Sequence, residues 1–110
     1  MTVKSYTLSF TIPASSTWTR LATLTTPAGV TRKALELRVY FSANAGASIR
    51  YYVETEYIGQ VNAEVWNKYI IPYSVDVTIP SGKTFAVEGA NSNSTAVTVI
   101  VELVVDETTA

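Results

Sequence analysis

The chain of 110 residues contains no cysteine and no histidine. Without cysteine, disulfide bonds and thiolate metal sites are excluded. Without histidine, the chain lacks the usual general base near neutral pH, the commonest zinc ligand and the base of Ser-His and Cys-His nucleophile systems. We therefore expect a protein that is not an enzyme and that carries no cofactor and no metal ion.

Charged residues are also scarce, at 15% of the chain, whereas ordinary soluble domains have about 25%. Eight basic and nine acidic residues give a net charge of -1, and no stretch gathers the basic ones, which argues against a nucleic-acid partner. Sixteen threonines and ten serines supply the polarity instead. Such a neutral, hydroxyl-rich surface suits contacts with protein or sugar, and it equally fits a plain threonine-rich sandwich.

Long apolar runs are missing as well, since none approaches the roughly 20 residues that a membrane helix needs. The chain passes from Met1 almost directly into a strand pattern, without the charged and apolar regions of a secretion signal. We therefore expect no membrane insertion and no export signal.

What the chain does contain is an apolar residue at every second position, the pattern of a strand with one buried face. Turn signals recur roughly every ten residues between these runs. The pattern predicts an all-β protein, an antiparallel two-sheet β-sandwich of about eight strands that is jelly-roll-like and forms a single domain over residues 1–110. The clearest runs are Val97, Val99, Val101, Leu103 and Val105; Tyr6, Leu8, Phe10 and Ile12; Leu35, Leu37, Val39 and Phe41; and Tyr73, Val75, Val77 and Ile79.

The expected strands include one, Thr17–Thr25, in which the alternation is broken, and this indicates either a bulge or an edge strand. The segment Val61–Ile71 fits both helical and strand spacing, and we expect a strand because its neighbours are strands. The other expected strands are Val3–Ile12, Lys33–Ser42, Ser48–Ile58, Tyr73–Ile79, Thr84–Gly89 and Ala96–Asp106.

Half of the aromatic residues lie within 23 positions, at Tyr51, Tyr52, Tyr57, Trp66, Tyr69 and Tyr73. Such rings can pack the core, anchor a protein interface or form a platform for sugar rings. The alternation points Tyr52 and Trp66 away from the core. It also places Ile58, Ile100 and Val104 on outward strand faces, where apolar side chains need a partner to cover them. These five residues are our candidate interaction site.

Two carboxylates, Glu54 and Glu56, lie two positions apart on a predicted strand. A regular strand would separate them by about 7 Å, a spacing that inverting glycosidases use. Cross-strand ion pairs with Arg50 or Arg38 explain the same two residues without a catalytic role. We therefore assign no catalytic residue.

The last third of the chain has a characteristic order of elements. The turn sequence Ile79-Pro80-Ser81-Gly82-Lys83-Thr84 is followed by a short apolar strand to Gly89, an asparagine- and serine-rich loop and the valine-rich strand. Over residues 73–106 this order resembles small β-sandwich proteins on virus and phage particles, of the capsid-decoration, turret or head-fibre type. The resemblance implies a non-enzymatic module, often trimeric, that binds a capsid lattice or projects from it.

We therefore expect a self-associating virion surface or capsid-decoration protein. Its expected partners are copies of itself, with a trimer favoured, and a capsid protein lattice, and its expected location is a virion assembled in the host cytoplasm. The alternative is a carbohydrate-binding β-sandwich module with a glycan partner. A secreted domain of that kind, extracellular after removal of its signal, would have the same sequence features.

Overall fold

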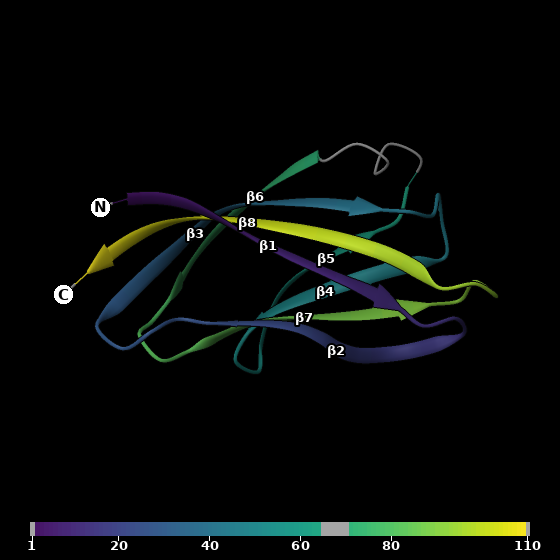
Figure 1. Ribbon diagram of the computed structural model, residues 1–110, viewed down its shortest axis with the longest axis horizontal. Helices are drawn as coiled ribbons and strands as arrows, with labels where there is room; N and C mark the ends of the chain where they lie inside the picture. The colour runs from purple at the N-terminus through teal and green to yellow at the C-terminus, as the bar shows by residue number, and fades with distance from the viewer. Residues whose placement is uncertain (1, 65–70, 110) are drawn as a thin grey trace.

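The computed structural model describes residues 2–64 and 71–109, which form eight strands in two four-stranded antiparallel sheets (Figure 1). This confirms the predicted two-sheet β-sandwich and its number of strands. The first sheet, sheet A, has the order β1 (Thr2–Ile12), β8 (Val97–Thr109), β3 (Val30–Phe41) and β6 (Ile71–Ile79). The second, sheet B, has the order β2 (Ser16–Thr25), β7 (Thr84–Asn91), β4 (Ala47–Val53) and β5 (Glu56–Asn62).

The strand pairs are nested along the chain. Strand β1 pairs with β8, β2 with β7, β3 with β6 and β4 with β5. Every connection except the one between β4 and β5 leads from one sheet to the other. This is the winding of an eight-stranded jelly roll, so the expected jelly-roll-like architecture is confirmed. The two ends of the chain lie side by side at one end of the sandwich, where Thr2 pairs with Glu107 (Figure 1).

The core is built by the alternation of side chains on the strands. The five inward residues of β8 that the sequence predicts, at positions 97 to 105, are at most 2% exposed. On β4, Ile49, Tyr51 and Val53 also face the core. Facing rows of apolar residues from the two sheets therefore enclose one continuous hydrophobic cluster.

The prediction that Leu35 faces the core is wrong, because this residue is 37% exposed. In the pairing with β8, Ala34 lies opposite Val105 and Glu36 lies opposite Val104, so Leu35 is an extra residue. This β-bulge shifts the alternation of β3 by one position. Ala34 and Leu37 take the buried positions on either side of it.

The predicted strand Ser48–Ile58 is also wrong, because it is a hairpin rather than one strand. Strand β4 ends at Val53 and β5 begins at Glu56, with Glu54 and Thr55 as the turn. Glu54 has a φ of +57°, in the left-handed region that favours glycine. The sequence pattern missed this turn because it contains no glycine, asparagine or proline.

Two other expectations concern irregular segments. Strand β2 is both bulged and at an edge of sheet B, so both alternatives for Thr17–Thr25 are true. Of the predicted strand Val61–Ile71, Val61 and Asn62 belong to β5, Ala63 and Glu64 follow it, and Ile71 begins β6. Positions 65–70 lie outside the described residues.

At the end of the sandwich away from the termini, the amide of Asn91 links the β1–β2 connection to the β7–β8 connection. Its Nδ2 donates to the backbone oxygens of Ile12, at 3.3 Å, and Thr95, at 2.9 Å, and its Oδ1 accepts from the backbone N–H of Asn93 at 2.9 Å. Asn93 in turn donates from Nδ2 to the backbone oxygen of Ala45. Asn91 is only 1% exposed, so these bonds replace water that the amide cannot reach.

We predict that Asn91→Ala lowers the free energy of unfolding by about 2–3 kcal/mol, because it leaves buried backbone oxygens without donors. Urea denaturation measures this change. The control is Asn44→Ala, which removes an exposed amide in the β3–β4 connection and should change the stability by less than about 0.5 kcal/mol. Equal effects of the two substitutions would contradict the role of Asn91.

Candidate functional site

The outer face of sheet B carries aromatic, arginine and amide side chains from several strands. The guanidinium of Arg50 on β4 lies over the ring of Trp18 on β2, with 4.0 Å between Cζ and the ring centroid. Arg50 Nε also donates to Gln60 Oε1 at 2.9 Å, and Gln60 Nε2 donates to Asn62 Oδ1 at 2.8 Å. These contacts make a continuous row across β2, β4 and β5.

A second group lies beside it, toward the β4–β5 turn. Tyr52 and Tyr57 meet edge to face, with 5.9 Å between ring centroids, and Arg20 Cζ lies 5.9 Å from the Tyr52 centroid. Tyr57 is 54% exposed, while Tyr52 is half-buried. The prediction that Tyr52 points away from the core is therefore confirmed. Trp66 lies outside the described residues, and its predicted role stays a prediction.

We call these two groups together the arginine–aromatic face, formed by Trp18, Arg20, Arg50, Tyr52, Tyr57, Gln60 and Asn62. Glu88 on β7 lies in register between Arg20 and Arg50. Flat rings beside amide and guanidinium donors can bind a polar, uncharged ligand by stacking and hydrogen bonding. The sequence analysis found Tyr52 here but missed Trp18 and Arg50, because they are 32 positions apart and meet only across β7.

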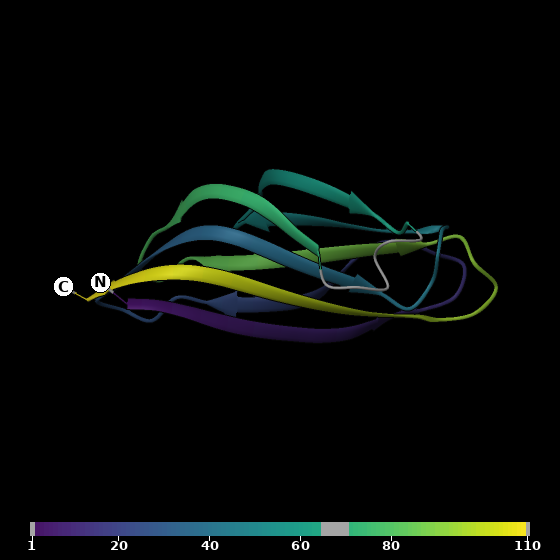
Figure 2. The same ribbon diagram turned by 90° about the horizontal axis from the view of Figure 1, so that it is seen from above.

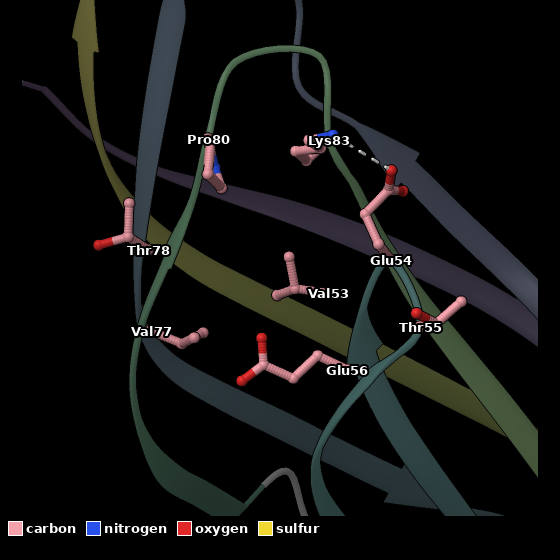
Figure 3. Close-up of a pocket in the computed structure, with 8 residues that line it drawn as sticks. All are labelled: Val53, Glu54, Thr55, Glu56, Val77, Thr78, Pro80 and Lys83. Carbon is pink, nitrogen blue, oxygen red and sulfur yellow. Dashed lines mark ion pairs between the residues drawn. The ribbon is translucent and has the colours of Figure 1, made fainter.

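A shallow hollow of about 340 Å³ lies between the β4–β5 turn and the end of β6 (Figure 3). Its lining includes Glu54, Glu56 and Lys83, and Figure 3 shows the carboxylate of Glu54 turned toward Lys83 Nζ, which is 3.9 Å away. Glu54 is also bound through its backbone N–H to Thr84 O at 2.8 Å, and its own carbonyl accepts from Arg20 Nη2 at 3.0 Å.

These contacts change the interpretation of the two carboxylates. Glu54 is a turn residue and Glu56 begins β5, so the predicted pair on one strand face does not exist. The expected ion pairs with Arg50 or Arg38 are also wrong. Glu54 pairs with Lys83, Arg38 binds Glu36 and Glu102, and Arg50 binds Gln60. The bonds of Glu54 hold a turn rather than leave a free catalytic carboxylate.

The other three predicted interaction residues lie apart from the arginine–aromatic face. Ile100 and Val104 are on the outer face of β8, as predicted, and both are half-buried. Between them Glu102 binds Arg38, with 2.8 Å from Oε1 to Nη1. The outward orientation predicted for Ile58 is wrong, because the turn at Glu54 and Thr55 places Tyr57 outward, opposite Tyr52, so the next residue, Ile58, packs against the core. The structure therefore places the four candidates among the described residues on different surfaces.

One side of the sandwich is less completely covered than the rest. Figure 2 shows β1 and β2 along one border of the molecule, with β5 and β6 along the opposite one. On the first border six apolar residues pack against the core yet stay only partly buried, whereas three described residues of β5 and β6 do so on the opposite border. The residues of β8 that pair with the three from β1 are fully buried. We call the first border the open side; its six residues are Tyr6, Leu8, Phe10, Leu21, Ala22 and Leu24.

Near the chain termini, a polar cluster closes the core. Arg32 is 4% exposed, and its guanidinium stacks on Tyr6, with 4.3 Å from Cζ to the ring centroid. Arg32 Nε lies 3.4 Å from Glu107 Oε2, and the hydroxyl of Tyr6 donates to the same oxygen. Lys4 Nζ lies 3.5 Å from the other oxygen of Glu107. The cluster therefore neutralises a buried arginine and fixes β1 against the end of β8.

Two searches of the described residues bear on other kinds of site. Among residues 2–64 and 71–109, no three histidine, cysteine, aspartate or glutamate side chains gather closely enough to hold a metal ion. In the same part of the chain no helix has the length and apolar character of a membrane span.

Comparisons with known proteins find likeness at the level of the fold. No protein-family model matches this chain, and no curated protein is similar to it in sequence. A chain from the acid-stable capsid structure of Helicobacter pylori bacteriophage KHP30 is 18% identical, with a TM-score of 0.54 over 96% of this chain and 94% of that one.

A chain from the structure described as "CBM4 structure and function", a carbohydrate-binding module, is 15% identical. Its TM-score is 0.51, over 93% of this chain and 84% of that one. The structural neighbours thus include viral capsid proteins and carbohydrate-binding modules, both non-catalytic kinds of protein. At these identities the likeness shows a shared jelly-roll fold.

The cluster around Glu107 predicts how stability depends on pH. The hydrogen bond from Tyr6, with the positive charges of Lys4 and Arg32, holds the pKa of Glu107 below its ordinary value of 4.5, although burial acts the other way. The folded chain then binds fewer protons here than the unfolded chain does. This stabilisation is therefore present above pH 4.5 and is lost as the pH falls through the lower, folded-state pKa.

We expect the urea midpoint of wild type to fall as the pH is lowered from about 5 to about 3. In Glu107→Gln this fall should be smaller, because the titrating carboxylate is gone. The control is Glu56→Gln, which changes an exposed carboxylate and should keep the slope of wild type. Parallel profiles for wild type and Glu107→Gln would show that the cluster does not act on Glu107 in this way.

Proposed function

We propose that this protein is a non-enzymatic structural module of a virus particle, a virion surface or capsid-decoration protein that associates with copies of itself. The observation that carries the proposal is the open side. Six apolar residues that belong to the core remain half-covered in the single chain, and a neighbouring subunit would remove them from water at about 25 cal/mol per Å².

The likeness to the phage capsid chain supports the same function. It extends over 96% of this chain and 94% of that one, so the shared unit is the whole jelly roll. Many viral capsid subunits have a jelly-roll fold. A particle protein also needs no catalytic group, which agrees with the engagement of Glu54 in holding a turn. The particle would be the location of the protein, and its capsid lattice a second partner.

Sedimentation of the purified protein over a range of concentrations tests this function. We expect a species heavier than the 11.9 kDa monomer, and its share should increase with concentration. The mass also gives the number of copies, for which the trimer implied by the resemblance stays a prediction. A monomer at every concentration would contradict the proposal.

A second function, binding of a carbohydrate, is supported by the arginine–aromatic face. Tyr57 offers an exposed ring, and the row from Arg50 through Gln60 to Asn62 offers planar polar groups within the same face. Aromatic faces stack on sugar rings, and amides and guanidinium groups bind their hydroxyls. The fold likeness to the carbohydrate-binding module agrees with this alternative.

A glycan array tests the second function. If a glycan is bound at this face, Tyr57→Ala and Tyr52→Ala should each weaken binding by at least about tenfold, since each removes a contact ring. Trp66→Ala tests the remaining predicted ring. The control is Tyr40→Ala, which removes a half-buried ring from sheet A and should leave binding unchanged. Absence of any glycan retention by wild type would exclude this function.

A further inference from the structure

Four strands lie at the edges of the two sheets, and β1 differs from the other three. Strand β2 has two register shifts, β5 has one shift and contains Gly59, and β6 contains Pro72 and pairs with β3 across a shift. Bulges, prolines and short lengths are the devices by which proteins keep sheet edges from pairing with another chain. Each of these three edges has at least one of them.

Strand β1 has none of these devices. Its 11 residues pair with β8 in unbroken register, and it contains no proline, no glycine and a single charged residue, Lys4. Among the described strands, β8 is its only partner, so every second residue presents its backbone N–H and C=O away from the sheet. A straight edge of this length, with one charged residue near its start, is a template for another strand.

We propose that β1 pairs with β1 of a second copy, antiparallel and centred on Thr7. This deepens the proposed function, on which it rests, by naming the surface through which the copies associate. The two A sheets then form one eight-stranded sheet, and the contact has two-fold symmetry.

The side chains of β1 match each other in this arrangement. Thr7 is the middle residue of the strand, so all 11 positions find a partner. Core-facing residues meet core-facing residues, with Tyr6 opposite Leu8 of the second copy. Hydroxyl residues meet on the outer face, with Ser5 opposite Ser9 of the second copy. A centre between two residues would instead place apolar side chains opposite hydroxyls, because the side-chain period is two.

Charge favours the antiparallel direction. In this register the two copies of Lys4 are six positions apart along the strand, about 20 Å, which is well beyond the Debye length of about 8 Å at physiological salt. A parallel pairing in register would place them side by side. The second copy also covers the β1 part of the open side, since Tyr6 and Leu8 lie opposite Leu8 and Tyr6 of its neighbour and Phe10 lies opposite its Lys4.

Single cysteines test the register, because the chain has no cysteine of its own. Thr7→Cys places two thiols directly opposite each other, at a Cα separation of about 5 Å that a disulfide can span. We expect mild oxidation to give a covalent dimer. The control is Thr11→Cys, an exposed threonine on the same strand and face, whose two copies are about 27 Å apart and should not cross-link. Equal cross-linking of both variants, or cross-linking of Thr11→Cys alone, overturns the proposal.

Charged variants test the same contact without covalent cross-linking. Thr7→Lys and Thr7→Glu each place like charges opposite each other and should weaken association by at least about tenfold, whereas an equal mixture of the two should restore it. The control is Thr23→Lys, an exposed threonine on the edge strand β2, which should associate as wild type does. Thr7 is exposed, so these variants keep the fold of the single chain.

The outcomes separate this proposal from the proposed function. If wild type associates and Thr7→Lys associates equally well, the β1 contact is wrong while the self-associating module stands. A trimeric wild type also overturns it, because a two-fold contact cannot be satisfied in all three copies. A monomeric wild type overturns both.

Discussion

Burial of the inner face of β8 organises both the sheet that contains this strand and the hydrophobic core. The strand is paired on one side with β1 and on the other with β3, and its five core-facing residues are almost completely removed from water. Since β8 is the last strand in the chain and β1 is the first, the sheet forms only when the two ends of the sequence meet. The fold is therefore held by contacts between distant segments, which is the property that makes β-sandwiches slow to fold.

The same arrangement explains why the surfaces of the molecule differ. Strands β8 and β3 have neighbours on both sides, while β1 has one and leaves half of its backbone groups directed outward. Its core-facing side chains are correspondingly less covered than those of β8. The arginine–aromatic face is different, because its side chains form hydrogen bonds and cation–π contacts with one another on the outer face of sheet B. A sheet edge suits association of subunits, and a polar aromatic face suits a ligand.

Some of the candidate site was readable from the sequence and some was not. The outward direction of Tyr52, Ile100 and Val104 follows from alternation alone, because their strands are regular around them. Ile58 was misplaced because the turn at Glu54 and Thr55, which the pattern does not reveal, changes which residues of β5 face the core. The contact between Trp18 and Arg50 was missed because their strands, β2 and β4, are not consecutive in the sequence and are separated by β7 in the sheet.

Alternation in the sequence is enough to predict that the chain forms strands, which face of most strands is buried, and that two such layers close into a sandwich. This is local information, because alternation is visible within one strand. Which strands pair, where Leu35 bulges out, and that a turn without glycine forms at Glu54 depend on contacts between distant segments. Backbone hydrogen-bonding groups are the same in every strand, so they do not specify a partner. The left-handed backbone of Glu54 is tolerated because Arg20, Lys83 and Thr84 bind it, and those contacts exist only after the sheets have assembled.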